Sequence, residues 1–429
     1  MKESKVESIG LVPNEWKKCR LKDIYKFEKG KNAQQYTAEY IGENEGDYPV
    51  YSGQTENDGI MGKISTYDYD INECIFTTTV GAKCMTLREL KGKFSLSQNC
   101  LIMNKRKENI NKYVLYALLP LFENEKNKIP SYMQPSLRIE DLQKFNLYLP
   151  NIKEQKIIAI FLEEEIEKID NILKNLNNQI ILLNDYKKAL ITETVTIGLN
   201  PNVEMKCSGI DWIGNIPKHW SVNRISNICK LKGRIGWQGL TTDEYIEEGP
   251  YLITGVDFSN GSIDWDNCEH VSEWRYNQAP EIQIKEDDLL ITKDGTVGKL
   301  AIVQNCPEKA TLNSGVLLIR DKNNKYINKF LYYILYSNEF WHWFEITNLG
   351  ATTITHLYQN IFAKFLVALP DIKEQQEIVD YLDKKCKVVD SLMQDKKEQL
   401  EKMEQYKKSL IYEYVTGKKR VKGAEELYG

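Results

Sequence analysis

The sequence repeats itself, and an internal repeat restricts the fold of a 429-residue chain more than any other feature does. Three segments of the first half return, in the same order, in the second half. The matched pairs are 8–16 with 212–220, 149–155 with 369–375, and 186–191 with 406–411. The first pair is offset by 204 positions and the other two by 220, so the second copy carries about 16 extra residues. The repeat predicts two copies of one unit, each a variable globular head followed by a segment that begins at Leu-Pro.

Both Leu-Pro segments are predicted to be long helices. Pro150 and Pro370 suit the start of a helix, and Asn151 or Asp371 can cap its first turn. Apolar residues then alternate at spacings of four and three, which is typical of a coiled-coil seam. In the first copy the seam is Leu162, Ile166, Ile169, Leu173, Leu176, Ile180, Leu183 and Leu190, interrupted by Lys187. In the second copy it is Leu382, Cys386, Val389, Met393, Leu400, Met403 and Leu410, interrupted by Lys396 and Lys407.

Two narrow seams in matching register favour pairing with each other. The alternative is that each helix lies as an amphipathic helix on its own globular core. The order head, helix, head, helix favours an antiparallel coiled coil, with the two halves related by a pseudo-twofold axis and a head at each end. A helix over residues 157–195 extends for ~58 Å at 1.5 Å per residue, so it serves as a rigid spacer.

The heads are predicted to be mixed α and β, which makes the whole chain an α+β protein. Short runs rich in β-branched residues, such as 74–80 and 288–292, are bounded by turn residues, and helical stretches follow at 113–122 and 326–344. Lys-Gly-Lys at 29–31 matches Lys-Gly-Arg at 232–234, and Val-Gly at 80–81 matches 297–298. The predicted boundaries are 1–150 for head 1, 151–197 for helical spacer 1, 198–370 for head 2, 371–417 for helical spacer 2, and 418–429 for a frayed tail.

Composition excludes several classes of protein. No apolar run approaches the ~18–20 residues that cross a bilayer, and the first residues lack the apolar segment of a secretory signal. Nine cysteines without a Cys-x-x-Cys pair indicate free thiols in a reducing cytoplasm. The four histidines share no metal-ligand spacing, and the sequence contains neither a phosphate-binding loop nor a methyltransferase or nuclease motif. We therefore expect a cytoplasmic protein without a catalytic site or a bound metal.

The chain resembles the specificity (S) subunit of type I restriction–modification systems over essentially its whole length. The resemblance rests on the two segments that begin Leu-Pro-x-Ile-x-Glu-Gln and close near Tyr-Lys-Lys-x-Leu-Ile, and on the final Val-Thr-Gly-Lys at 415–418. Asp-Gly-Thr-Val-Gly-Lys at 294–299 also resembles target-recognition domains of that family, whereas head 1 has Thr-Thr-Val-Gly-Ala at 78–82 and lacks the flanking charges.

The resemblance implies a non-catalytic subunit that reads a split DNA site. Each head would be a target-recognition domain for one half of an asymmetric, bipartite sequence in double-stranded DNA, and the helices would set the gap between the halves. The helices would also dock methyltransferase (M) subunits, expected to number two, that methylate adenine N6. Restriction (R) subunits would join them. S-adenosylmethionine, ATP and Mg would be bound by those partners and not by this chain.

The DNA contacts are expected to come from local basic and amide side chains, because the net charge is only −4 and neither head is a basic domain. Arginine and lysine suit phosphate or guanine, and asparagine and glutamine suit adenine. In head 1 the candidates are Lys29, Lys31, Lys83, Arg88, Lys91, Lys93, Gln98 and Asn99. In head 2 they are Lys232, Arg234, Gln238, Lys293, Lys299, Asn313 and Arg320. Each of these side chains has the alternative of being an ordinary solvated surface residue.

Two other functions remain open on the sequence alone. One is a nuclease or methyltransferase with its own recognition heads, against which the missing motifs argue. The other is a two-headed coiled-coil scaffold that binds proteins and has no DNA specificity. DNA binding in the presence of a methyltransferase partner distinguishes that scaffold from a specificity subunit.

Overall fold

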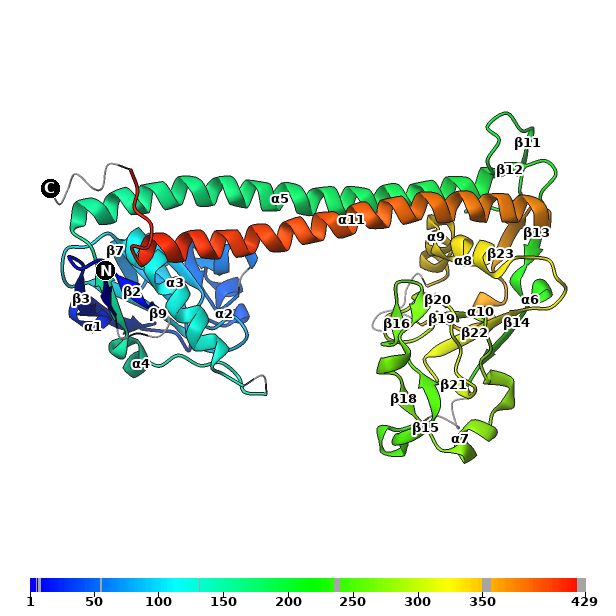
Figure 1. Ribbon diagram of the computed structural model, residues 1–429, viewed down its shortest axis with the longest axis horizontal. Helices are drawn as coiled ribbons and strands as arrows, with labels where there is room; N and C mark the ends of the chain where they lie inside the picture. Colours follow the sequence, from blue (N-terminus) through cyan, green and yellow to red (C-terminus); the bar gives the residue numbers. More distant parts are fainter. Residues whose placement is uncertain are drawn as a thin grey trace. The chain divides into compact units, whose positions relative to one another are not determined.

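The computed structural model describes residues 1–422 except 5, 7–8, 55, 131, 235–239 and 349–355. Two long helices dominate it, α5 (Ile152–Ile197) and α11 (Ile372–Val415). The chain forms two compact units, Met1–Asn177 with Glu398–Gly429, and Asn178–Lys397. Each unit therefore contains one head together with part of α5 and part of α11 (Figure 1). The prediction of two heads and two long helices is confirmed.

The head of the first unit is built on a six-stranded sheet in the order β4-β9-β7-β8-β5-β6. Its strands are β4 (Tyr25–Lys29), β5 (Glu45–Tyr51), β6 (Ile60–Ile64), β7 (Tyr69–Thr78), β8 (Leu87–Leu96) and β9 (Cys100–Lys105). The other elements are β1 (Lys2–Glu3), β2 (Leu11–Val12), β3 (Lys17–Arg20), α1 (Leu21–Ile24), α2 (Ala38–Glu43), the 3-10 turn η1 (Glu56–Gly59), α3 (Asn111–Asn127), α4 (Ile139–Lys144) and β10 (Asn146–Leu149). Helix α3 packs against β7 and β8 and contributes Tyr113, Val114 and Leu118 to the main core of this unit.

The head of the second unit has a four-stranded sheet, β14-β22-β19-β20, and a three-stranded sheet, β18-β15-β21. Their strands are β14 (Cys229–Gly233), β15 (Ile246–Ile253), β18 (Glu269–His270), β19 (Leu289–Thr292), β20 (Leu300–Ile302), β21 (Ala310–Leu312) and β22 (Val316–Asp321). The other strands and helices are β11 (Met205–Cys207), β12 (Asn215–Pro217), β13 (Ser221–Arg224), α6 (Ile225–Ile228), β16 (Phe258–Ser259), β17 (Ser262–Ile263), α7 (Glu273–Asn277), α8 (Asn328–Tyr336), α9 (Asn338–Thr347), α10 (Gln359–Phe362) and β23 (Leu366–Leu369). Short 3-10 turns are η3 (Thr242–Glu244), η4 (Trp265–Asn267) and η5 (Pro280–Ile282).

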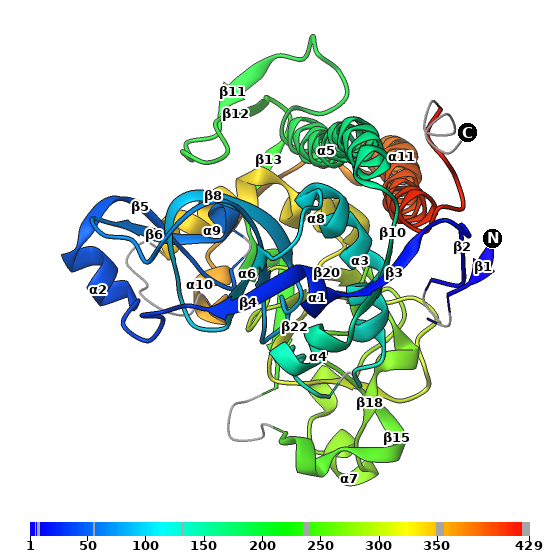
Figure 2. The same ribbon diagram turned by 90° about the vertical axis from the view of Figure 1, so that its left-hand side faces the viewer.

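The two heads share the pairing of their central strands, as the repeat predicts, although these strands form one sheet in head 1 and two sheets in head 2. Strand β4 pairs with β9, which also pairs with β7, and β14 pairs with β22, which also pairs with β19, all antiparallel. Each head also has one parallel pair, β5 with β8 and β15 with β21. The second head departs from the predicted helical stretch at 326–344, because the chain ends one helix at Ser337 and starts another there. In Figure 2, the elements labelled in the first head include β4, α1 and α4.

The two helices pair antiparallel within each unit. In the first unit, Leu162 and Ile169 of α5 share a core with Leu410 and Val415 of α11. In the second unit, Ile191 of α5 lies in a core with residues from the start of α11. The remaining predicted seam residues are buried or half-buried, namely Ile166, Leu173, Leu176, Ile180, Leu183, Leu382, Val389, Met393, Leu400 and Met403.

The lysines that interrupt the seams are paired across it. Lys187 of α5 contacts Asp390 of α11 at 2.7 Å, and Lys407 of α11 contacts Asp170 of α5 at 2.5 Å. Each ion pair lies within one unit, and the two pairs occupy equivalent positions of the repeat. These contacts explain how a charged residue is accommodated at a seam position: its stem packs against the facing helix while its ammonium reaches a carboxylate.

The Leu-Pro motif joins each long helix to its own head through a buried glutamine. Asn151 and Asp371 cap the first turns, accepting hydrogen bonds from the backbone N–H of Glu154 and Glu374, both at 2.9 Å. The amide of Gln155 donates to the carbonyl of Pro150 and accepts from the N–H of Ile110, where α3 begins. Gln375 does the same with Pro370 and Ile327, where α8 begins.

The end of α11 and the following residues pack on the N-terminal part of the first unit. Gly417 adopts a φ of +70° with Pro13 and Trp16 against it. Lys418 donates to the Tyr412 hydroxyl at 2.6 Å, and Arg420 forms an ion pair with Glu15. The expectation of a frayed tail is therefore wrong for residues 418–420, because these side chains have partners on the folded unit.

Replacing Gln375 with alanine is expected to lower the free energy of unfolding by about 1–3 kcal/mol, because it leaves buried backbone groups of Ile327 and Pro370 unpaired. The neighbouring Gln376 is exposed and bonds to Asp380 on the same helix, so Gln376→Ala is the control and should stay within about 0.5 kcal/mol of wild type. Urea unfolding followed by circular dichroism measures both. Equal stabilities of the two variants would contradict the role of the motif glutamine.

Candidate nucleic-acid interface

Four predicted DNA contacts of head 1 line one groove. The groove has a volume of about 620 Å³ and brings together Lys29, Lys31, Gln98 and Asn99. Three further amide side chains border it, those of Asn32, Gln34 and Gln35. None of its lining residues is acidic, so the groove offers two ammonium groups and five amides to a ligand that is anionic and rich in hydrogen-bonding groups.

The groove is built where strand ends meet. Strand β4 ends at Lys29, opposite Leu101 of β9, and the turn that precedes β9 carries Gln98 and Asn99. Asn99 has a φ of +61°, which turns the chain sharply, and its carbonyl accepts the N–H of Thr79 at 2.7 Å. A Cβ at Gly30 would lie 2.5 Å from the carbonyl oxygen of Leu96. Glycine is therefore required at this position to bring the two loops together.

The cations of the groove are held in different ways. Lys31 donates to the backbone carbonyl of Asp68 at 2.7 Å and lies 4.5 Å from the ring centre of Tyr69. Burial raises the pKa of Tyr69 to about 12, so this ring stays neutral and keeps its hydroxyl bonded to the carbonyl of Lys29. Lys29, Gln98 and Asn99 have exposed side chains. The groove is thus preformed on one wall and accessible to a ligand on the other.

The remaining candidates of head 1 do not line this groove. Arg88, Lys91 and Lys93 belong to β8, and Lys83 lies in the loop before it. Lys93 is opposite Asp70 in the β7–β8 ladder and lies 4.6 Å from the ring centre of Tyr67. The neighbouring Tyr67 hydroxyl raises the pKa of the Lys93 ammonium, which stays charged at neutral pH. These four residues lie on β8 or in the loop before it, outside the groove.

The hydrogen bonds of Thr78 and Thr292 fix how the loops of the two heads correspond. Both hydroxyls donate into the loop that follows, to the carbonyls of Lys83 and Thr296, and both accept a backbone N–H where the loop returns, from Thr86 and Lys299. Counting from these threonines, Val-Gly at 80–81 corresponds to Asp-Gly at 294–295. The predicted match to 297–298 is therefore wrong. The loop of head 1 is also one residue longer, since its chain returns at Thr86, eight positions after Thr78, whereas that of head 2 returns at Lys299, seven positions after Thr292.

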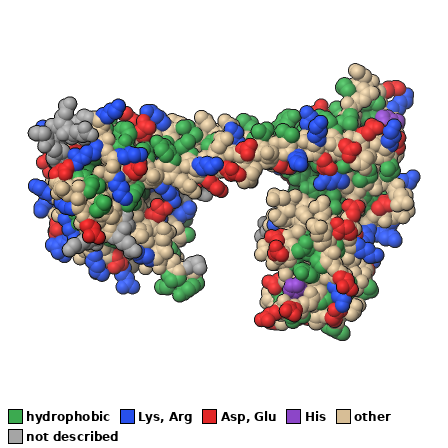
Figure 3. Space-filling view, in the orientation of Figure 1, with side chains coloured by type: hydrophobic (Ala, Val, Ile, Leu, Met, Phe, Trp, Pro, Cys, Tyr) green, Lys and Arg blue, Asp and Glu red, His purple; other side chains and the backbone are tan. Residues whose placement is uncertain are grey.

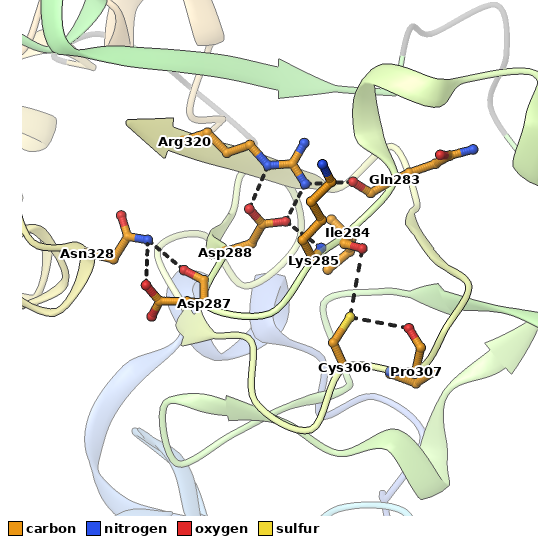
Figure 4. A network of polar contacts seen from close by, with 9 residues as sticks. All are labelled: Gln283, Ile284, Lys285, Asp287, Asp288, Cys306, Pro307, Arg320 and Asn328. Atoms are coloured by element: carbon orange, nitrogen blue, oxygen red, sulfur yellow. Dashed lines mark hydrogen bonds and ion pairs between the residues drawn. The ribbon is translucent and has the colours of Figure 1, made fainter. Parts of the chain in front are cut away.

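Arg320 is a structural clamp of head 2 (Figure 4). Its guanidinium binds both carboxylate oxygens of Asp288, at 2.6 and 2.5 Å, and the carbonyl of Gln283 at 2.7 Å. Asp288 is buried and also accepts the N–H of Lys285. Beside this clamp, Asn328 binds Asp287, and the Cys306 thiol contacts the carbonyls of Ile284 and Pro307. We therefore leave Arg320 out of the proposed DNA contacts.

The other candidates of head 2 divide into buried and accessible groups. Arg234 is buried, donates to the carbonyl of Leu312 and the hydroxyl of Thr311, and has its pKa lowered by burial. Lys299 donates to the carbonyl of Gly255 at 3.0 Å. The side chain of Asn313 bonds to the Tyr245 hydroxyl.

Lys232 is exposed, and Lys293 is half-buried with its ammonium beside Gly233. Gln238 lies outside the described residues. Head 2 therefore offers Lys232 and Lys293 near the loops that correspond to the groove of head 1, whereas Arg234, Lys299 and Asn313 support those loops.

Sequence reasoning missed several polar residues that border these sites. Asn32, Gln34 and Gln35 closely follow the Lys-Gly-Lys segment. A run of amides beside a basic turn is a sequence pattern that indicates base recognition, because amides pair with base edges. In head 2, Lys230, Lys322, Gln359 and Asn360 surround Lys232 in a second groove. These four come from three separate segments, so no local pattern in the sequence joins them.

The described residues contain no group of three His, Cys, Asp or Glu side chains placed to hold a metal ion. Within the same part of the chain, no helix has both the length and the apolarity that a membrane span requires. All nine cysteines are free, as predicted, and most are buried. Burial raises the pKa of the Cys100 and Cys229 thiols to about 12, which leaves them protonated and unreactive at neutral pH.

Comparison with known proteins identifies the family. The type I restriction modification DNA specificity domain matches twice, over residues 13–182 and 217–402. The chain therefore belongs to this family, as a specificity subunit and not as one of the catalytic subunits of such systems.

Two relatives from Methanocaldococcus jannaschii are similar over nearly their whole length. The type I restriction enzyme MjaVIII specificity subunit is 26% identical, with 97% of this chain and 96% of the relative covered. The putative MjaX specificity subunit is 27% identical, with 97% of each covered. A solved structure described under complex assembly and conformational transition of the type I R-M system has a TM-score of 0.67 at 15% identity, covering 95% of this chain and 99% of that one. This last likeness concerns the fold.

Replacing Arg320 with glutamine is expected to destabilise the protein by about 2–4 kcal/mol, because it leaves the buried carboxylate of Asp288 without its cation. The additional change Asp288→Asn removes that charge and should recover part of the loss. Thermal unfolding of wild type, Arg320→Gln and the double variant measures the cycle. A single variant as stable as wild type would show that Arg320 is free for another role.

Proposed function

We propose that this chain reads an asymmetric, bipartite site in double-stranded DNA on behalf of a type I restriction–modification complex in the cytoplasm. The observation that carries the proposal is the pair of heads with one fold and different polar surfaces. Head 1 presents two lysines and five amides in its groove, whereas the corresponding loops of head 2 present Lys293. Unlike reading surfaces imply unlike half-sites, because each base pair shows its own pattern of donors and acceptors in the major groove.

The groove of head 1 is the proposed reading surface for one half-site. Amides of Gln98, Asn32 and Gln35 suit the donor and acceptor edge of adenine, and Lys29 suits guanine or a phosphate. In head 2 the proposed base contacts are Lys293 and, beyond the described residues, Gln238, whereas Lys232 is proposed to contact the DNA backbone. Separate contacts to the DNA backbone are proposed for Lys83, Arg88, Lys91 and Lys93. Helices α5 and α11 run through both units and are proposed to set the number of unread base pairs.

The outer faces of the helices are proposed to dock the partner subunits. In the second unit, Leu182 and Tyr186 of α5 are exposed and four residues apart, as are Val388 and Leu392 of α11. Residues four apart lie on one face of a helix, so each helix shows an apolar stripe to solvent. Figure 3 shows hydrophobic side chains on the surface of the helices.

Exposed apolar stripes of this kind fit helices of a partner protein. We propose that two methyltransferase subunits dock here, and that restriction subunits join them. S-adenosylmethionine, ATP and Mg would then be bound on those partners.

The second candidate is a scaffold that binds proteins through its two heads without DNA specificity, for which the exposed stripes alone are an argument. The two candidates differ in one measurement. The complex of this chain with its methyltransferase partner, mixed with a library of duplexes at stated salt, selects a motif if the chain reads DNA. It returns unselected sequences if the chain is a scaffold.

Methylation-sensitive sequencing of DNA from cells that express the chain with its methyltransferase should reveal two different short motifs separated by a fixed gap. Gln98→Ala should make one position of one half-site degenerate, since a bidentate base contact is worth about 1–3 kcal/mol of discrimination. The other half-site should stay unchanged. Gln405→Ala, on the exposed face of α11, is the control. A single continuous motif, or two identical half-sites, contradicts the bipartite reading.

Leu392→Glu is expected to weaken assembly with the methyltransferase about tenfold or more, because it places a charge in an apolar contact. Size-exclusion chromatography of the mixed subunits measures assembly, and circular dichroism checks that the variant is folded. The matched control is Lys384→Glu, a charge change at an exposed polar position of the same helix. If Leu392→Glu assembles as well as this control, the docking surface lies elsewhere.

A further inference from the structure

A basic groove lies on the edge of the four-stranded sheet in the second unit. Its volume is about 590 Å³, and three lysines line it, Lys230 and Lys232 of β14 and Lys322 after β22. Two amides from α10 complete the polar lining, Gln359 and Asn360. None of the lining residues is a carboxylate. Figure 3 shows basic side chains gathered on this side of the unit, near the position of β14 in Figure 1.

The three lysines are available to a ligand. All three side chains are exposed, and none of them forms an ion pair with a described residue. Lys322 donates to the backbone carbonyl of Ser226 at 2.5 Å, which positions its ammonium without neutralising it. The amide of Gln359 donates to the carbonyl of Leu231 at 3.1 Å, which holds α10 against the edge strand. The groove is therefore a preformed concentration of three positive charges.

The same surface of head 1 carries a smaller positive charge. The strand registers make Lys26 and Glu28 the counterparts of Lys230 and Lys232. The predicted match of 29–31 with 232–234 is therefore wrong by one residue, because Lys29 corresponds to Gly233. The N–H groups of Arg106 and Lys322 bond to equivalent carbonyls, those of Ile24 and Ile228. Lys26 and Glu28 form an ion pair at 3.3 Å, and α4 offers Glu140 where α10 has Asn360. Ser226 of the groove corresponds to Lys22 of α1. Three cations and two carboxylates thus stand where head 2 has three cations and no carboxylate.

The groove is continuous with the loops that correspond to the reading groove of head 1. Lys232 directly precedes Gly233. A Cβ placed on Gly233 would lie 3.7 Å from the ammonium nitrogen of Lys293. Gln359 follows Leu357 by two residues, and the N–H of Leu357 bonds to the carbonyl of Lys293 at 3.0 Å. A duplex read by these loops therefore passes beside the groove.

We propose that Lys230, Lys232 and Lys322 bind phosphates of the DNA backbone, so that this surface of head 2 attracts DNA more strongly than the same surface of head 1. The inference rests on the proposed function. Lysine ammonium groups in a concave surface without carboxylates suit phosphodiesters, and the exposed amides add hydrogen-bond donors. Phosphate contacts carry no sequence information, so the groove strengthens binding and leaves the choice of motif to the loops.

The test measures how DNA binding by the complex with the methyltransferase depends on salt. Each neutralised phosphate contributes about 0.9 to the slope of log affinity against log salt concentration. The triple variant Lys230→Gln, Lys232→Gln and Lys322→Gln should flatten that slope by roughly 2 to 3. The motif selected from a duplex library should stay the same. The triple change to arginine retains the charges and should keep the wild-type slope.

The control removes the same charge elsewhere on the second unit, with Lys218→Gln, Lys285→Gln and Lys325→Gln, whose side chains are exposed outside the groove. A groove variant whose slope equals that of the control overturns the inference. Wild-type complex that fails to prefer its motif over scrambled DNA overturns the proposed function itself. Circular dichroism of both triple variants confirms that they fold, so a flattened slope reports lost phosphate contacts.

Discussion

Each head depends on the end of the helix that belongs to the other copy of the repeat. In the first unit, Val415 lies in the core with Trp16, and its carbonyl accepts the Tyr113 hydroxyl. In the second unit, Ile191 and Val195 lie in the core with Trp220. The helices also start on the heads that precede them, through Gln155 and Gln375. This exchange makes the helix pair part of both cores, so the antiparallel arrangement is fixed by hydrophobic burial and by two buried hydrogen-bonded glutamines.

The packing of helix ends into both cores explains which parts of the repeat resemble each other. The repeated segments are those that build the junction: the tryptophan, the Leu-Pro motif and the Tyr-Lys-Lys segment, whose lysines pair with Asp390 and Asp170 across the helices. The loops between them face solvent and carry different side chains in the two heads. A scaffold held by its junctions tolerates change in its loops, which leaves the loops free to carry different DNA specificities.

The sequence predicted the architecture well because its signals are local. Helices predicted over 151–197 and 371–417 are observed over Ile152–Ile197 and Ile372–Val415, and the capping roles of Asn151 and Asp371 follow from spacing alone. The candidate site was predicted in part. Lys29, Lys31, Gln98 and Asn99 meet in one groove although about 70 residues separate the two pairs. Arg320 and Arg234 read as surface charges because their partners, Asp288 and Leu312, are distant in the sequence. The Lys230 groove depends on the strand register of β14 and β22, which composition does not reveal.

The two units also differ in whether their residues are continuous in the sequence. The second is one continuous stretch, Asn178–Lys397, whereas the first combines Met1–Asn177 with Glu398–Gly429. During synthesis from the N-terminus, the second unit has all of its residues before the first unit has received its last. The core around Trp16 and Tyr113 is completed only after the final turns of α11 have been synthesised. The earliest part of the protein to be made is therefore the last to be finished, and a truncated product leaves the apolar surface around Trp16 open to chaperones and proteases.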